Sequence, residues 1–215
     1  MNEIVFLYPN TKEPFTTSEV VAERTGMSYR SVQRLIEKHL PELRRFGFVR
    51  FEITPIETQR GKREKKVYRL NEQQATLLVA FMRNNEVVTE FKVELVRQFY
   101  AMREELRAVR AAKTERRPIR QDLLHAIKML PDSPHKQWKY KQYTDLAYIV
   151  ALGKTAKQIR AERGAGKSAT VSDYLTAEEL ATVARCEDQA RVLLELGLPY
   201  QNVKAMLMRG RQLNA

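Results

Sequence analysis

The chain has 215 residues, of which 43% are hydrophobic and 30% charged, and its formal net charge is +12. This length and apolar content predict two small domains, each able to bury a core. No apolar run approaches the roughly twenty residues of a membrane span, and the first residues, MNEIVFLYPN, lack the pattern of a secretory signal. A single cysteine, Cys186, excludes an internal disulfide framework and favours a reducing cytoplasm.

Residues 1–17 contain a short apolar run, Ile4 to Leu7. This run is expected to add an edge strand or to cover the core, and it indicates no function of its own.

Residues 18–40 have the spacing of a helix-turn-helix. Ser18 is the expected N-cap of a short first helix, Gly26 the turn residue, and Ser28 the N-cap of a second helix. The second helix is expected to be apolar on one face, at Val32, Leu35 and Ile36. An ordinary helical hairpin with a solvated basic face is the alternative at this point.

Residues 48–54 (FVRFEIT) alternate Val49, Phe51 and Ile53 with charged residues, which predicts a half-buried strand. Residues 67–70 make a plausible return strand. The basic stretch between them, PIETQRGKREKK, is expected to be the hairpin loop with Gly61 at its tip. Two helices followed by a basic hairpin predict a winged helix-turn-helix.

The positive charge is concentrated in the same block. Residues 29–70 hold twelve Lys and Arg against five Glu, so +7 of the net +12 falls there. Because each Lys or Arg placed on a phosphate releases condensed counterions, this concentration favours a polyanionic partner.

Residues 71–82 predict a helix that closes the core beneath the hairpin. A longer helix is expected over 86–112, since apolar residues recur there every three or four positions: Val88, Phe91, Leu95, Phe99, Met102, Leu106 and Val109. One small domain cannot easily bury that whole stripe. Its second half, Phe99, Met102, Leu106 and Val109, is therefore expected either to form a homodimer contact or to pack on the chain's own C-terminal domain.

Residues 114–118 (TERRP) interrupt the periodicity and predict a linker. Five further helices are expected beyond it, over 119–130, 136–152, 155–163, 176–196 and 199–209. Two of them begin with capping-box signals, Thr155 with Gln158 and Thr176 with Glu179.

Enzymatic and metal chemistry finds little support. Gly164 to Ser168 matches the end of a phosphate-binding P-loop, but Ala161 stands where the first glycine should be, and a helix precedes the segment. His39, His125 and His135 lack partners at metal-ligand spacing. No metal or cofactor and no enzymatic activity are expected. Trp138, Tyr140 and Tyr143, interleaved with lysines, predict helix-anchoring aromatics in preference to a platform for single strands.

Three blocks resemble the Rha family of phage regulatory proteins: TSEVVAERTGMSYRSVQRLI, KVYRLNEQQATLLVAFM and TEFKVELVRQFYAM, which lie between Thr17 and about Leu106. The sequence departs from the family pattern at residues 84–88, where a glycine-containing turn would be expected. The runs YTDLAYIVALGKTAKQIRAERG and DYLTAEEL look like a segment of phage antirepressor-like regulators. These resemblances imply a phage or prophage regulator, acting in the cytoplasm of a bacterial host.

Together these patterns predict a mainly α chain. A winged helix-turn-helix domain with a small β-hairpin wing and a long helix is expected over 1–113, a linker over 114–118, and an all-helical domain for self-association or partner binding over 119–215.

The hypothesis for function is a transcriptional regulator that binds duplex DNA. The second helix would enter the major groove with Ser28, Tyr29, Arg30, Ser31, Gln33 and Arg34. Arg30 and Arg34 have the geometry for paired hydrogen bonds to guanine, and Gln33 for adenine. The wing would hold phosphates with Arg60, Lys62, Arg63, Lys65 and Lys66. The rival hypothesis is an antirepressor that captures a phage repressor protein through its helical C-terminal region.

Overall fold

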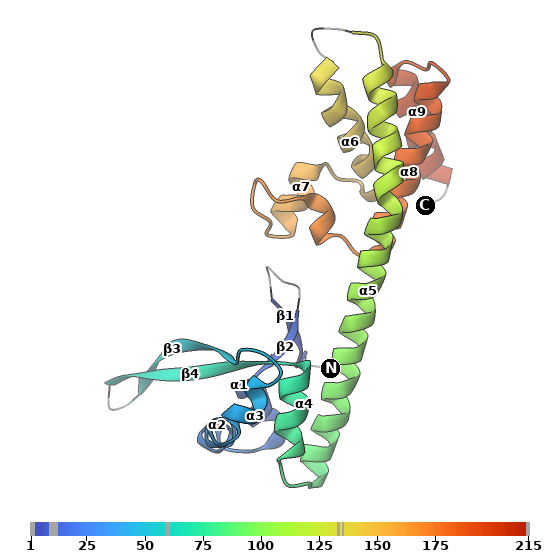
Figure 1. Ribbon diagram of the computed structural model, residues 1–215. Helices are drawn as coiled ribbons and strands as arrows, with labels where there is room; N and C mark the ends of the chain where they lie inside the picture. Colours follow the sequence, from blue (N-terminus) through green and yellow to red (C-terminus); the bar gives the residue numbers. More distant parts are fainter. Residues whose placement is uncertain (1–2, 9–12, 59–60, 133, 135, 214–215) are drawn as a thin grey trace. The chain divides into compact units, whose positions relative to one another are not determined.

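The computed structural model describes residues 3–8, 13–58, 61–132, 134 and 136–213. It divides into two compact units, Met1–Leu106 and Arg107–Ala215. The described part is mainly helical, with a small antiparallel sheet in the first unit (Figure 1). The predicted fold class is therefore confirmed.

The sheet of the first unit has the strand order β1-β2-β4-β3 and is antiparallel throughout. Its strands are β1 (Phe6–Leu7), β2 (Pro14–Thr17), β3 (Arg50–Thr58) and β4 (Gly61–Asn71). The pairing of β3 with β4 runs from Arg50 opposite Arg69 to Thr58 opposite Gly61. Figure 1 shows this hairpin extending beyond the helices of its unit.

The predicted twelve-residue loop over 55–66 is wrong, because all of its described residues are paired in β3 or β4. The dense charge that suggested a loop is compatible with a strand here. A two-stranded ribbon surrounded by water leaves room for long charged side chains on both faces, and the β-branched residues Ile53, Thr54, Ile56 and Thr58 favour the extended backbone.

The helix-turn-helix of the first unit consists of α1 (Ser18–Thr25) and α2 (Tyr29–Lys38). Gly26 ends α1 with φ of 67°, and the Ser28 hydroxyl accepts a hydrogen bond from the Ser31 amide at 3.1 Å, as the sequence predicts. The expected N-cap of α1 is wrong by one residue, because Thr17 caps this helix. Helix α3 (Leu40–Arg44) was not predicted.

Helix α4 (Glu72–Ala80) begins with a capping box formed by Asn71 and Gln74. Helix α5 (Glu86–Met129) follows, and the Asn85 side chain accepts a hydrogen bond from the Val88 amide at 2.8 Å. This asparagine caps the start of the long helix.

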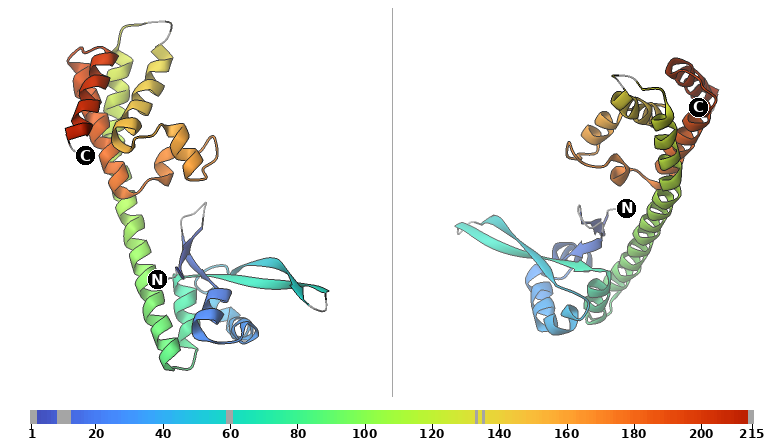
Figure 2. Two further views of the ribbon diagram at one scale, coloured as in Figure 1. Left: turned by 180° about the vertical axis from the view of Figure 1, so that it is seen from behind. Right: turned by 45° about the horizontal axis from the view of Figure 1, so that its top comes forward.

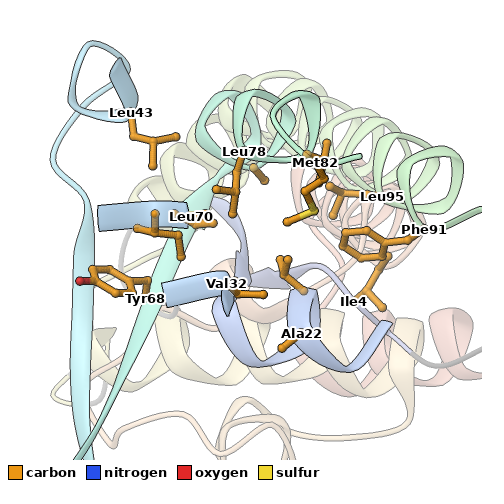
Figure 3. Packing of buried hydrophobic residues seen from close by; sticks show 14 of the residues in the cluster. Ile4, Ala22, Val32, Leu43, Tyr68, Leu70, Leu78, Met82, Phe91 and Leu95 are labelled. Atoms are coloured by element: carbon orange, nitrogen blue, oxygen red, sulfur yellow. The ribbon is translucent and has the colours of Figure 1, made fainter. Parts of the chain in front are cut away.

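The core of the first unit joins the N-terminal segment, the helix-turn-helix, β4, α4 and the first part of α5. Figure 3 shows Ile4, Ala22, Val32, Leu70 and Phe91 converging from these elements. The Gln98 side chain also accepts hydrogen bonds from the Ile4 and Val5 amides, at 2.9 and 3.2 Å. The apolar run near the N-terminus therefore does both things expected of it, since it adds an edge strand and covers the core.

The second unit contains the end of α5 together with α6 (Lys136–Leu152), α7 (Ala156–Glu162), the 3₁₀ helix η1 (Val171–Tyr174), α8 (Ala177–Glu195) and α9 (Tyr200–Leu213) (Figure 2). Both predicted capping boxes, at Thr155 and Thr176, are present. Buried side chains of α5, α6, α8 and α9 form a separate core. No helix among the described residues is both long and apolar enough to cross a membrane.

The predicted helix break over 114–118 is wrong, because α5 continues through these residues with Pro118 inside it. Arg116 and Arg120 flank the proline, and both bind Glu187 of α8, whose side chain is fully buried. Arg116 donates from Nε and Nη2 at 2.8 and 2.7 Å, and Arg120 from Nη1 at 3.0 Å. These bonds hold the segment in helical form, although proline normally disfavours a helix interior. The boundary between the compact units lies earlier, after Leu106.

We predict that Glu187→Gln lowers the free energy of unfolding by about 3 kcal/mol, because it leaves two arginines without their shared carboxylate. Asp188→Asn is the matched control. Asp188 belongs to a surface pair with Arg191, and its loss should cost less than about 0.5 kcal/mol. Urea denaturation followed by circular dichroism measures both values, and equal effects would contradict a structural role for Glu187.

Candidate nucleic-acid interface

Helix α2 presents a basic face to solvent. Arg30, Ser31 and Arg34 are exposed, whereas Val32 and Ile36 are fully buried. Arg30 and Arg34 are four residues apart, so they lie one above the other on the same side of the helix. This arrangement agrees with the amphipathic pattern of the sequence.

Two other residues of the expected contact set bind the hairpin. The Tyr29 hydroxyl and the Gln33 Nε2 both donate hydrogen bonds to the backbone carbonyl of Lys66 in β4, the second at 3.1 Å. A paired contact from Gln33 to adenine needs the same amide nitrogen. The expected adenine contact therefore conflicts with the observed hydrogen bond of Gln33.

Ser18 adds a third link between the helices and β4. Its hydroxyl accepts a hydrogen bond from the buried Tyr68 amide at 3.0 Å and lies 3.3 Å from the Tyr29 hydroxyl. Ser18 is itself fully buried. Side chains of α1 and α2 thus bind consecutive outward-facing backbone groups of β4, which holds the exposed face of α2 and the hairpin in a fixed arrangement.

Burial raises the pKa of Tyr29, although its hydrogen bond with Ser18 and the nearby Lys65 act in the opposite direction. The phenol therefore stays protonated across the physiological range. A protonated hydroxyl is what the bond to the Lys66 carbonyl requires, because a carbonyl can only accept.

The expected phosphate-binding residues of the wing fall into three groups. Arg60 lies outside the described residues, and Lys62 and Arg63 belong to β4 without described side chains. Lys65 pairs with Glu19, and its Nζ lies 4.3 Å from the centroid of the Tyr29 ring. The Lys66 Nζ lies 4.2 Å from the centroid of the Phe51 ring. Lys65 and Lys66 thus make contacts within the protein that a phosphate would have to compete with.

Sequence reasoning missed the exposed apolar side chains of the hairpin. Val49 is buried as predicted, but Phe51 and Ile53 are 45% and 55% exposed, and the preceding Phe48 is 74% exposed. The prediction of a half-buried strand is wrong for these residues because the hairpin extends past its core. Alternation alone cannot tell a packed strand face from one that faces water.

The four residues expected to form a dimer contact are divided between the two cores. Phe99 is buried in the first core, and Met102 packs against it. Val109 packs against the second core, and Leu106 is partly exposed. Packing within the chain thus accounts for Phe99, while a dimer contact through the other three stays a prediction.

The metal site and the aromatic residues considered from the sequence can also be compared with the structure. No group of acidic residues, His or Cys in the described part of the chain has the arrangement of a metal site. His39 stacks on Phe81 with 3.8 Å between ring centroids. Tyr143 is buried, as expected of an anchoring aromatic, but Trp138 is exposed and borders a hollow beside Lys141 and Asp145. The prediction that Trp138 anchors its helix is therefore wrong.

We predict that Ser18→Ala lowers the free energy of unfolding by about 1 to 3 kcal/mol, because the buried Tyr68 amide loses its acceptor. Ser31→Ala removes the same atom from an exposed position, where its hydroxyl pairs with that of Ser28, and should cost less than about 0.5 kcal/mol. Urea denaturation compares the two. If Ser18→Ala were as mild as its control, the link between α1 and β4 would contribute no net stability.

Comparison with known proteins finds a family for the first unit. Residues 16–104 match the model of the phage regulatory protein Rha. No curated protein matches the chain. The matched region includes the helix-turn-helix, the hairpin, α4 and the start of α5, so it covers the basic face of α2 and its links to β4. The likeness of the C-terminal run to antirepressor-like regulators stays a prediction. The N-terminal part of the chain is thus similar to the phage regulatory protein Rha family.

Proposed function

We propose that this protein is a phage-type transcriptional regulator of the bacterial cytoplasm whose first unit binds duplex DNA. Helix α2 would lie in the major groove, and the β3–β4 hairpin would follow the phosphates. One observation carries the proposal. Arg30 and Arg34 are exposed on α2, and hydrogen bonds from Tyr29 and Gln33 attach the same helix to the hairpin. The similarity of residues 16–104 to a family of phage regulatory proteins supports the regulatory setting.

Base recognition would rest on fewer residues than the sequence suggested. Arg30 and Arg34 are exposed on one face, and each guanidinium can form two hydrogen bonds with the major-groove edge of guanine. Ser31 lies beside them. Tyr29 and Gln33 would act as positioning residues, because their polar atoms already bind the Lys66 carbonyl.

The hairpin would supply affinity that does not depend on base sequence. Lys62 and Arg63 lie near the end of β4 farthest from the core, in register with Glu57 and Ile56. When α2 lies in the major groove, cations at the end of the projecting hairpin can approach the phosphate backbone of the same duplex. The net positive charge of residues 29–70 suits this role.

A second candidate function is that of an antirepressor. The second unit has its own buried core, and Trp138 on α6 is exposed next to a hollow lined by Lys141, Gln142 and Asp145. Exposed tryptophan is enriched at the energetic centres of protein interfaces. Capture of a phage repressor by the full chain, abolished by Trp138→Ala while DNA binding remains, would favour this function.

We predict that Arg34→Ala weakens binding to a selected operator by about 1 to 3 kcal/mol, with a smaller loss on random DNA. Arg185→Ala is the matched control, since Arg185 is an exposed arginine of the second unit. Fluorescence anisotropy with the operator chosen by in vitro selection measures both. An equal loss on operator and random DNA would remove Arg34 from base recognition.

We predict that Lys62→Ala weakens binding to operator and random DNA alike, and lowers the slope of log K against log salt by about one. A salt titration of the same anisotropy assay measures the slope, with Lys204→Ala, an exposed lysine of α9, as the control. No binding to any duplex at low salt by the wild-type chain would overturn the proposed function itself.

A further inference from the structure

We propose that two copies of this chain associate through an exposed apolar face of α5, with the two helices antiparallel. The face consists of Glu86, Thr89, Val93, Val96, Tyr100 and Arg103, hereafter the outer face, and its apolar centre is formed by Val93, Val96 and Tyr100. The inference does not depend on DNA binding. The buried Phe99 is no longer a dimer contact, and exposed side chains of the same helix take that role.

Helix α5 has two apolar faces within the first unit. Val88, Phe91, Leu95 and Phe99 are buried in the core. Val93, Val96 and Tyr100 repeat at the same three- and four-residue intervals but are 55%, 44% and 53% exposed. At about 100° per residue the two sets lie about 130° apart around the helix, so the second set cannot reach the same core. Single exposed valines are ordinary, whereas a periodic set on one helix indicates a contact surface.

The charges at the ends of the outer face indicate that a second copy of the chain can bind it. Extended at intervals of three and four residues, the face runs from Glu86 through Thr89 to Arg103. In an antiparallel pair of identical helices, Glu86 of one copy lies opposite Arg103 of the other, and Val93 lies opposite Val96. A parallel pair would place Glu86 against Glu86 and Arg103 against Arg103. The face is therefore complementary in charge to itself only in the antiparallel orientation.

Arg103 is placed to take part in such a contact. Its guanidinium lies 4.5 Å from the centroid of the Tyr100 ring and binds Glu72 at 3.3 Å. Its side chain is still 38% exposed. Arg103 thus extends along the outer face, and its remaining surface is accessible to a carboxylate of a second copy.

A hollow beside the outer face provides a complementary shape. It has a volume of about 500 Å³, and its lining includes Val87, Thr89, Phe91 and Val93. In the antiparallel register, Tyr100 of the second copy lies opposite Thr89 and therefore reaches this hollow. The apolar side chains suit the tyrosine ring, and Glu90, Glu94 and Arg97 at the same hollow provide polar partners for its hydroxyl. By symmetry each copy fills the hollow of the other.

Sedimentation equilibrium of the full-length chain, without DNA, tests the contact. We expect a dimer at micromolar concentration and a dissociation constant raised at least about tenfold by Val96→Glu. Ala101→Glu is the control, because Ala101 is exposed on the same helix but outside the outer face. A wild-type chain that stays monomeric, or a dimer as tight with Val96→Glu as without it, would overturn the proposal.

Charge reversal tests the paired ends. Glu86→Arg should raise the dissociation constant several-fold more than Glu105→Arg, which makes the same change of net charge at an exposed position off the outer face. Thermal unfolding of each variant checks that the fold is intact. Equal effects of the two reversals would rule out the pairing of Glu86 with Arg103.

Oxidative cross-linking tests the orientation. A mixture of Thr89→Cys and Tyr100→Cys chains should form a mixed disulfide, because these residues lie opposite each other in the antiparallel register. Neither variant alone should cross-link efficiently, since its two cysteines would be about 16 Å apart along the helices. The wild-type chain is the blank, since its Cys186 is buried. Cross-linking of Thr89→Cys with itself would indicate parallel helices and overturn the proposal. Because none of these measurements uses DNA, failure of the dimer and failure of DNA binding are told apart.

Discussion

The arrangement of the first unit depends on which groups make hydrogen bonds to the backbone of β4. Strand β2 pairs with β4 only at residues 69–71, so the backbone groups of β4 before that point lack a strand neighbour on this side. Side chains take over: Ser18 accepts from the Tyr68 amide, and Tyr29 and Gln33 donate to the Lys66 carbonyl. An unsatisfied buried backbone group costs more than an average hydrogen bond contributes, so these contacts constrain where α1 and α2 can sit.

This constraint divides the basic residues into two kinds. Lys65 and Lys66 lie beside the contact points on β4 and interact with Glu19, Tyr29 and Phe51. Arg30 and Arg34 are exposed and lie about 100° around α2 from Tyr29 and Gln33, the residues that bind β4. A count of charges treats all of these residues alike. The geometry gives the Lys65 side chain and the Lys66 carbonyl a part in joining helix to hairpin, and it leaves the arginines accessible to a ligand.

Local signals predicted most of the helical framework. The caps at Ser28, Thr155 and Thr176 and the turn at Gly26 depend on residues within a few positions of each other, and all four are present. The failures involve distant partners. Pro118 lies inside a helix whose neighbouring arginines bind Glu187, and Gln33 binds a carbonyl 33 residues away. The spacing of residues in the sequence cannot predict such bonds. The exposure of Phe51 and Ile53 likewise depends on where the core ends, which the sequence pattern does not show.

The hairpin and α5 both expose apolar side chains in the described part of the first unit, and their surroundings distinguish them. On the hairpin, the ammonium group of Lys66 lies over the Phe51 ring, and Pro55 lacks the amide hydrogen that another strand would need. Proline and charge on an edge strand oppose pairing with a further chain. The outer face of α5 has neither feature, because its central side chains are apolar and its charges stand at the two ends with opposite sign. The outer face therefore lacks these obstacles, and its apolar centre with opposite charges at its ends suits contact with a second copy.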